Sequence, residues 1–189
     1  MQSGTRLGDW SPDGRRFAFS VVSPDSGNDI WLLEPGENAS AKPFVKTPSY
    51  DEQPEFSPDG NWVAYRSSVS GRPEIYVQAS RGPERRSRVS SQGGTEPIWS
   101  PVRREIYYLQ GTELMAVSYE TGEDGFRPGK PQALFDVAVN GEAYNQYDIS
   151  PDGERFLFLK DSGEDPPPTE LRVETSWTEG LKRLAVGTN

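Results

Sequence analysis

The sequence predicts an all-β fold, a β-propeller segment made of four four-stranded antiparallel blades. The first observation is a recurring turn motif whose serines fall 46, 43 and 50 residues apart, at Ser11, Ser57, Ser100 and Ser150. A repeat period of about 40–50 residues is typical of propeller blades. The second observation is the abundance of Gly (19) and Pro (17), which fits short strands joined by many turns. The third is a short apolar run after each motif.

The turn motif has a physical basis. Three copies read Ser-Pro-Asp-Gly, at 11–14, 57–60 and 150–153. Pro presets the first corner of a type I turn, Asp can bind nearby backbone amides, and Gly takes the left-handed position that follows. The motif therefore joins two antiparallel strands. The remaining copy, Ser-Pro-Val-Arg-Arg at 100–104, lacks Asp and Gly, so we expect a turn of another type there.

Each blade is expected to contain further strands in a fixed order. A large apolar residue precedes each turn, at Trp10, Phe56, Trp99 and Ile149. Second strands are expected at 17–19, 63–65, 106–108 and 156–158, and third strands at 29–33, 74–77, 113–117 and 170–173. Weaker fourth strands are expected at 42–45, 87–90 and 132–135, because the outermost strand of a blade is solvated.

These elements define one propeller segment over residues 1–189, with blades at about 5–47, 48–92, 93–136 and 142–177. The fourth blade has no clear outer strand. The tail at 178–189 is expected to form a helical turn against a blade, or else that missing strand. Because the first motif begins so early, the chain is expected to be part of something longer.

The pattern F-S-P-D-G, V-A-Y and I-Y-V at 56–77 resembles the TolB-type propeller repeat, a WD40-like unit of bacterial proteins. The resemblance covers nearly the whole chain in four copies. Such repeats occur in periplasmic Tol-system proteins, beside bacterial Ser/Thr kinases and regulators, and in some peptidases as a non-catalytic domain. The segment 177–184 is similar to the C-terminal end of kinase-associated propellers. The resemblance implies a part of a larger bacterial sensor or kinase-associated protein, and suggests a periplasmic location.

The charge of the chain disfavours two classes of partner. Its formal net charge is −9, and the resulting field repels phosphate backbones and anionic lipid. We therefore expect neither nucleic acid nor insertion into a membrane. No apolar stretch approaches the roughly 20 residues that a membrane helix needs, and the first residues do not resemble a signal peptide.

Catalytic and metal-binding chemistry has little support in the sequence. The chain has no His and no Cys, which excludes Ser-His-Asp and Cys-His nucleophiles, disulfides and thiolate metal sites. No Ser-x-x-Lys spacing occurs, and the acidic groups at 51–52 and 161–165 are interpreted as solvated charge. The oxygen-rich loops at 25–29 and 161–165 do not match a calcium-binding loop. We expect no catalytic residue, no metal and no cofactor.

Ligand binding is expected at the channel mouth and on one rim, where loops from all blades converge. The predicted ligand-binding residues are Asn28, Tyr50, Asp51, Glu52, Arg72, Glu96, Tyr144, Asn145 and Gln146. Alternatively, these side chains only fill and solvate a narrow channel. The tryptophans at 10, 31, 62 and 99 are expected to pack between blades.

Four blades are few for a closed ring, and an open arc exposes two apolar blade faces. Three outcomes follow: two copies form an eight-bladed ring with two-fold symmetry, one chain closes as a tight four-bladed ring, or an arc persists with its ends covered in another way. Pairing of two copies is favoured, because one repeated interface covers both faces.

The sequence thus favours a non-catalytic protein- or peptide-binding or scaffold module that homo-oligomerises. One alternative is the accessory domain of an enzyme, such as a peptidase gate or a carboxylate-based hydrolase or lyase. That alternative predicts a pocket in which two carboxylates converge with shifted pKa values. Another is a purely structural fragment whose partner is its own copy.

Overall fold

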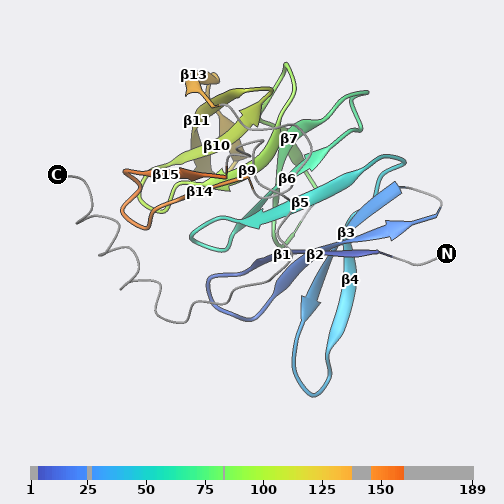
Figure 1. Cartoon of the computed structure of the whole chain (residues 1–189). Helices are drawn as coiled ribbons and strands as arrows, with labels where there is room; N and C mark the ends of the chain where they lie inside the picture. Colours follow the sequence, from blue (N-terminus) through green and yellow to red (C-terminus); the bar gives the residue numbers. More distant parts are fainter. Residues whose placement is uncertain (1–3, 25–26, 83, 138–145, 160–189) are drawn as a thin grey trace, which may run out of the picture.

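The computed structural model describes residues 4–24, 27–82, 84–137 and 146–159. Every regular element within those residues is a β-strand, and all strand pairs are antiparallel. Figure 1 shows the sheets following one another in chain order, from the blue first blade to the orange strands of the fourth. The predicted all-β propeller fold of four-stranded antiparallel blades is confirmed.

The blades begin with their inner strands. Blade 1 contains β1 (Thr5–Trp10), β2 (Phe17–Ser23), β3 (Gly27–Glu34) and β4 (Ser40–Val45), in that order. Blade 2 contains β5 (Asp51–Phe56), β6 (Trp62–Ser67), β7 (Glu74–Ala79) and β8 (Arg86–Arg88). Blade 3 contains β9 (Thr95–Trp99), β10 (Glu105–Gln110), β11 (Glu113–Gly122), β12 (Gly125–Pro128) and β13 (Gln132–Asp136). The described part of blade 4 contains β14 (Tyr147–Ile149) and β15 (Phe156–Phe158).

The Ser-Pro-Asp-Gly motif forms the same turn in blades 1, 2 and 4. In blade 2 the Ser57 hydroxyl donates to Asp59 Oδ1 at 2.5 Å and accepts from the Trp62 amide at 3.0 Å. The Gly60 amide donates to the Ser57 carbonyl at 2.8 Å, and its φ of 69° requires the left-handed region. The first and fourth blades repeat these bonds. Each turn thus closes the hairpin between an inner strand and its neighbour.

The turn of blade 3 differs, as expected from its sequence. The Arg103 amide donates to the Ser100 hydroxyl at 3.1 Å, in place of the carbonyl bond made by the glycine in the other blades. The Ser100 amide still donates to the Glu105 carbonyl at 2.9 Å. The hairpin therefore closes without Asp and Gly, but by different bonds.

Blade 3 also contains a hairpin that the sequence did not predict. The first half of the long strand β11 pairs with the expected outer strand β13, and its second half pairs with β12. Phe126 of β12 is buried against Trp62, Trp99 and Tyr119, and its carbonyl accepts from the Ser87 hydroxyl at 2.9 Å. The β11–β12 hairpin therefore lies across the outer part of blade 2.

Consecutive blades pack through apolar side chains at equivalent positions. Ala18 of blade 1 packs against Phe56 and Val63 of blade 2. The same position in blade 3, Tyr107, packs with Tyr147 of blade 4. We call these contacts between consecutive blades seams. Each seam buries the faces that two neighbouring blades present to each other, and this burial is the expected source of propeller stability.

The strand tryptophans divide into two groups. Trp62 and Trp99 lie between blades 2 and 3, as expected. Trp31 is partly buried, and Trp10 is 51% exposed. Both belong to blade 1, which has no blade before it in the described residues. The predicted third strand at 170–173, the loop at 160–169 and the tail at 178–189 lie outside the described residues.

Candidate binding site at the channel mouth

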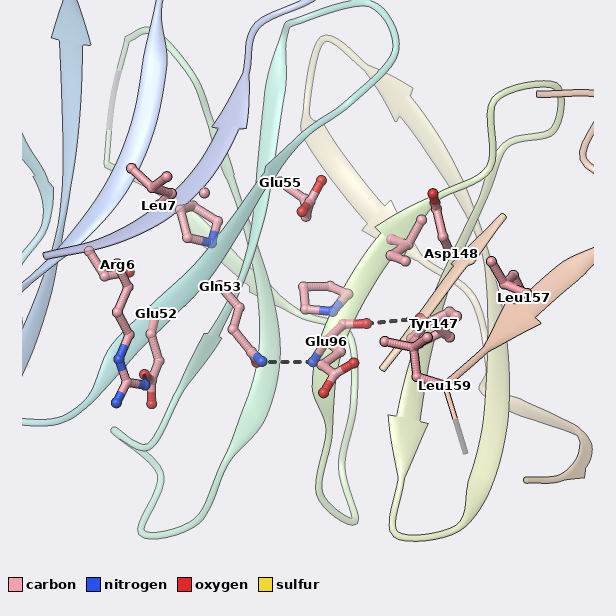
Figure 2. Close-up of a pocket in the computed structure, with 15 residues that line it drawn as sticks. Arg6, Leu7, Glu52, Gln53, Glu55, Glu96, Tyr147, Asp148, Leu157 and Leu159 are labelled. Atoms are coloured by element: carbon pink, nitrogen blue, oxygen red, sulfur yellow. Dashed lines mark hydrogen bonds and ion pairs between the residues drawn. The ribbon is translucent and has the colours of Figure 1, made fainter. Parts of the chain in front are cut away.

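The inner strands of all four blades line one cavity of about 690 Å³. Figure 2 shows β1, β5, β9 and β14 side by side along its wall, with Leu7 near one end and Leu157 near the other. Apolar and acidic side chains both face the space. The lining residues are Arg6, Leu7, Gly8, Ser20, Glu52, Gln53, Pro54, Glu55, Glu96, Pro97, Ile98, Tyr147, Asp148, Leu157 and Leu159.

Two inner strands carry the same backbone irregularity at this wall. Gln53 and Glu96 have positive φ values of 57° and 54°, and each precedes a proline. A following proline disfavours the right-handed helical region, and a left-handed residue interrupts the regular ladder. The pairing register shifts at both places, between Glu52 and Glu55 in β5 and between Thr95 and Ile98 in β9. The shift turns these side chains toward the next blade.

At the channel mouth, a chain of hydrogen bonds joins the inner strands of blades 2, 3 and 4. The Glu96 amide donates to Gln53 Oε1 at 3.0 Å, and Glu96 Oε2 accepts from the Gln146 amide at 2.8 Å. The Tyr147 hydroxyl donates to the Glu96 carbonyl at 2.8 Å. Glu96 is buried, and this burial raises the pKa of its carboxyl against the opposing effect of the Gln146 amide. Glu96 thus fixes the spacing of three inner strands.

A second polar cluster lies at the mouth between blades 1 and 2. The buried carboxylate of Glu52 accepts from Arg6 at 2.9 Å, from Arg66 at 2.6 Å and from Asn28 Nδ2 at 3.0 Å. Arg6 comes from β1 and Asn28 from β3, while Glu52 and Arg66 belong to blade 2. Charge-assisted bonds of this kind hold a rigid geometry. The cluster therefore preorganises the rim beside the cavity.

Farther along the wall, carboxyl groups recur at equivalent positions. Asp9, Glu55 and Asp148 each lie two residues before the turn serine, and Ile98 takes that place in blade 3. Burial, followed by the charges of Asp9 and Asp148, holds the pKa of Glu55 well above its usual value of 4.5. Burial likewise raises the pKa of Asp9, although its carboxylate accepts from the Phe56 amide at 2.9 Å. The wall is therefore acidic, and burial raises the pKa of two of the carboxyl groups in this part of the channel, Glu55 and Asp9.

The structure brings some of the predicted ligand-binding residues together. Asn28 and Glu52 meet in one cluster, and Glu96 and Gln146 meet in the other. Tyr50 is exposed on the rim outside the cavity wall. Tyr144 and Asn145 lie outside the described residues.

Two other predicted residues, Asp51 and Arg72, bond to side chains in or next to blade 2. The buried carboxylate of Asp51 accepts from the Ser67 hydroxyl at 2.5 Å and from Thr47. Arg72 donates to the buried Glu74 at 2.7 Å. Their side chains support the local structure of blade 2, and neither lines the cavity.

Several wall residues were not among the predicted ones, notably Arg6, Gln53, Glu55 and Asp148. A signal for them exists in the sequence. Counting back two or four residues from each turn serine finds six of the wall residues, namely Leu7, Gln53, Glu55, Glu96, Ile98 and Asp148, although Asp9 and Gln146 at the same positions do not line the cavity. Arg6 carries no such signal, because its role depends on its contact with Glu52 in the neighbouring blade.

The repeated turn, the four antiparallel sheets and the shared wall define a propeller domain with a polar channel mouth. The chain belongs to the TolB beta-propeller domain family, whose model matches residues 5–124. This membership fits a non-catalytic binding or scaffold role.

Two curated relatives show how much of a whole protein the chain represents. An uncharacterized protein of Agrobacterium fabrum is 25% identical over 168 residues, which cover 80% of this chain and 53% of the relative. The Tol-Pal system protein TolB of Nitrosospira multiformis is 39% identical over 57 residues, which cover 29% of this chain and 13% of TolB. The chain thus spans about half the length of the first relative and less of the second.

Solved structures support the fold. A protein of Agrobacterium tumefaciens provisionally assigned as TolB superposes with a TM-score of 0.58 at 20% identity, over 85% of this chain and 60% of that chain. TolB of Acinetobacter baumannii gives 0.60 at 18% identity, over 86% and 39%. A Bacteroides uniformis protein provisionally assigned as a 6-phosphogluconolactonase gives 0.55 at 16% identity, over 84% and 48%. At these identities the likeness concerns the fold alone.

Proposed function

We propose that the channel wall binds an extended segment of a protein or peptide without catalysing a reaction. The observation that carries the proposal is the preorganised mouth, where Glu52 and Glu96 are each buried and held by several hydrogen bonds. Such a rim loses little conformational entropy when a ligand arrives. Apolar wall residues beside it, such as Leu7 and Ile98, would supply contact area.

The charge of the wall favours a ligand segment with basic side chains. Four of the lining residues are acidic, namely Glu52, Glu55, Glu96 and Asp148, whereas Arg6 is the single cation among them in the described chain. Arg6 pairs with Glu52 at 2.9 Å. A concave acidic surface attracts cationic groups and repels phosphate or carboxylate groups.

The test is a binding measurement with short extended peptides that contain either lysines or glutamates, at pH 8 and low salt. Lysine-containing peptides should bind, and Asp148→Asn should weaken that binding by about fivefold, since Asp148 is an exposed wall residue and one charge contact is worth about 1 kcal/mol in a solvated site. Glu37→Gln, which alters an exposed loop acid of blade 1, is the matched control. Equal binding of both peptide classes, or an equal effect of both variants, would contradict the proposal.

Carboxylate-based hydrolysis is a second candidate, because one observation favours it. Glu55 has a raised pKa in a cavity that Asp148 also lines, which is the arrangement an acid–base mechanism needs. A phosphorylated sugar lactone fits poorly, since the wall is predominantly acidic. Assays with neutral lactones and glycosides decide the matter: turnover that disappears in Glu55→Gln would support catalysis, and absence of turnover across the panel would reject it.

The association with a larger bacterial sensor or kinase-associated protein remains a prediction. The resemblance to kinase-associated propellers depends on residues 177–184, which lie outside the described part of the chain. A role in a bacterial sensor protein is consistent with a recognition module of this shape. The periplasmic location also stays a prediction.

A further inference from the structure

We propose that a second cavity, between the turns of blades 1 and 2, binds a small organic acid through its carboxylate group. The cavity lies at the opposite end of the inner strands from the channel mouth, because β1 and β5 end at Trp10 and Phe56, directly before these turns. It has a volume of about 690 Å³, which suits a small ligand. Every lining residue comes from blades 1 and 2, so the site is independent of what the channel binds.

Three arginines line this cavity, and within the described residues none of them forms an ion pair with a carboxylate. Arg15 and Arg81 are exposed, whereas Arg16 is only 5% exposed. Five other arginines of the described chain do pair with an acidic side chain, namely Arg6, Arg66, Arg72, Arg127 and Arg155. The cavity therefore gathers cationic groups that lack the usual partner.

Arg16 carries a buried positive charge that is bonded to neutral groups. Its terminal nitrogens donate to the Ser80 carbonyl at 2.9 Å and to the Gly60 carbonyl at 3.1 Å, and its Nε has no hydrogen-bond partner in the described part of the chain. Burial, followed by the positive charge of Arg81, lowers the pKa of Arg16. An arginine stays protonated at neutral pH, so a bound anion, and not the loss of a proton, relieves this repulsion.

The two carboxylates in the cavity wall are held by their own turns. Asp59 accepts at both oxygens, from the Ser57 hydroxyl at 2.5 Å and from the side-chain amide of Asn61 at 2.9 Å. Asp13 accepts from the hydroxyl of its turn serine at 2.6 Å and from the Arg15 backbone amide at 3.0 Å. Three cationic side chains thus line the cavity with two anionic ones, and one further negative charge balances the site.

The formation of the turn does not account for two adjacent arginines in blade 1. The equivalent positions in blades 2, 3 and 4, counted from the turn serine, hold Asn61 and Trp62, Arg104 and Glu105, and Glu154 and Arg155. Blades 2 and 4 nevertheless form the same turn as blade 1. The concentration of positive charge is therefore a property of this cavity and not of the repeat.

The charge balance favours a carboxylate over a phosphate group. Guanidinium groups bind both in a planar, bidentate manner, but a carboxylate carries one negative charge at neutral pH and a phosphate group carries nearly two. The carboxylates of Asp13 and Asp59 oppose the second charge. Beside the arginines, Pro12, Trp62 and Ala79 also line the cavity and supply apolar surface. The site thus suits a carboxylate attached to a small apolar body.

The test is a titration of the intact chain with benzoate at neutral pH and low salt, followed by NMR of the backbone amides. The dissociation constant should be on the order of 1 mM, since a ligand of about nine non-hydrogen atoms buries little surface. The amides of Arg15, Asn61 and Arg81 should shift most. Those of Glu96 and Gln146 should not shift, because they belong to the channel mouth.

Two further ligands test the charge requirement. Benzamide has nearly the shape of benzoate without its charge, and should bind at least about tenfold more weakly because it loses the charge-assisted hydrogen bonds. Phenyl phosphate carries the additional negative charge and should also bind more weakly than benzoate.

Two exposed arginines can be removed without disturbing the buried contacts of Arg16. Arg15→Ala and Arg81→Ala should each raise the dissociation constant for benzoate about tenfold, since each removes a charge-assisted hydrogen bond. Arg104→Ala is the control for Arg15, because Arg104 takes the same position in the turn of blade 3. Arg85→Ala is the control for Arg81, because Arg85 is exposed, lies four residues later and does not line the cavity. Both controls should leave benzoate binding unchanged.

Three results would overturn the proposal: no shifts at Arg15 and Arg81 with up to about 20 mM benzoate, equal binding of benzoate and benzamide, or equal effects of Arg81→Ala and Arg85→Ala. Tighter binding of phenyl phosphate would reject the carboxylate as the preferred group. Shifts confined to Glu96 and Gln146 would place the anion at the channel mouth and also reject the site. Failure of benzoate to bind leaves the channel proposal intact, because lysine-containing peptides test the other end of the inner strands.

Discussion

The carboxylate of Glu96 accepts a hydrogen bond from the backbone amide of Gln146 at 2.8 Å, and this bond connects the inner strands of blades 3 and 4. The amide of Glu96 donates to Gln53 of blade 2 at 3.0 Å. One residue therefore sets the relative position of three blades at the channel mouth. Its left-handed backbone, ahead of Pro97, is what allows the side chain and the amide to point to different blades.

Replacing Glu96 by alanine should lower the free energy of unfolding by about 1.5–3 kcal/mol, because the Gln146 amide would lose a charged acceptor. Glu96→Gln keeps an oxygen acceptor and should cost less. Urea unfolding measures both variants, with Glu37→Ala as the control at an exposed loop position. Equal losses for Glu96→Ala and Glu96→Gln would mean that the hydrogen bond is not the source of the effect.

The stability of the fold should depend on pH through Glu55. Burial and the charges of Asp9 and Asp148 hold the pKa of Glu55 well above 4.5, so the folded chain binds this proton more tightly than the unfolded chain. The free energy of unfolding therefore falls as pH rises from about 4.5 through the raised pKa. Glu55→Gln cannot ionise, so it should match the wild type near pH 4 and exceed its stability near pH 8.

Urea unfolding at several pH values between 4 and 8 checks this prediction. A smaller fall should remain in Glu55→Gln, because burial also raises the pKa of Asp9. Parallel pH curves for the variant and the wild type would show that Glu55 titrates normally.

Local chemistry explains why so much of the fold could be predicted. The turn at Ser57 needs only a hydroxyl, a carboxylate and a glycine within four residues, so the same residues produce it wherever they recur. The β11–β12 hairpin has no such local signature. Its position depends on Phe126, whose partners Trp62 and Trp99 come from two different blades.

The candidate site shows the same division between local and distant causes. Glu52 and Glu96 lie next to the start of an inner strand, which is visible in the sequence. The pairing of Glu52 with Arg6, 46 residues away, depends on how two blades pack. The raised pKa of Glu55 also depends on blade packing, because its causes are burial first and then the carboxylates of Asp9 in blade 1 and Asp148 in blade 4.

The β11–β12 hairpin should depend on the burial of one aromatic ring. Phe126→Ala should lower the free energy of unfolding by about 3–5 kcal/mol, the usual loss for a buried phenylalanine. Phe135→Ala alters a ring that is 45% exposed and should cost clearly less. Chemical unfolding followed by tryptophan fluorescence suits the measurement, since Trp62 and Trp99 contact Phe126. Similar losses for the two variants would argue against docking of the hairpin on blade 2.

Arg16 should be irreplaceable by lysine. Its guanidinium is buried between blades 1 and 2, 5.1 Å from the centre of the Phe56 ring, and donates to the carbonyls of Gly60 and Ser80. A lysine ammonium lacks the planar fork that reaches two carbonyls at once, and a buried ammonium is harder to desolvate. Arg16→Lys should therefore lower the free energy of unfolding by about 2–3 kcal/mol.

The neighbouring Arg15 is exposed and provides the matched control, because Arg15→Lys preserves charge at a solvated position and should change stability by less than about 0.5 kcal/mol. Arg16→Met tests the alternative that only the packing of the side chain matters, since methionine fills similar space without donating. If Arg16→Met were as stable as the wild type, the two carbonyl contacts would contribute nothing to holding blades 1 and 2 together.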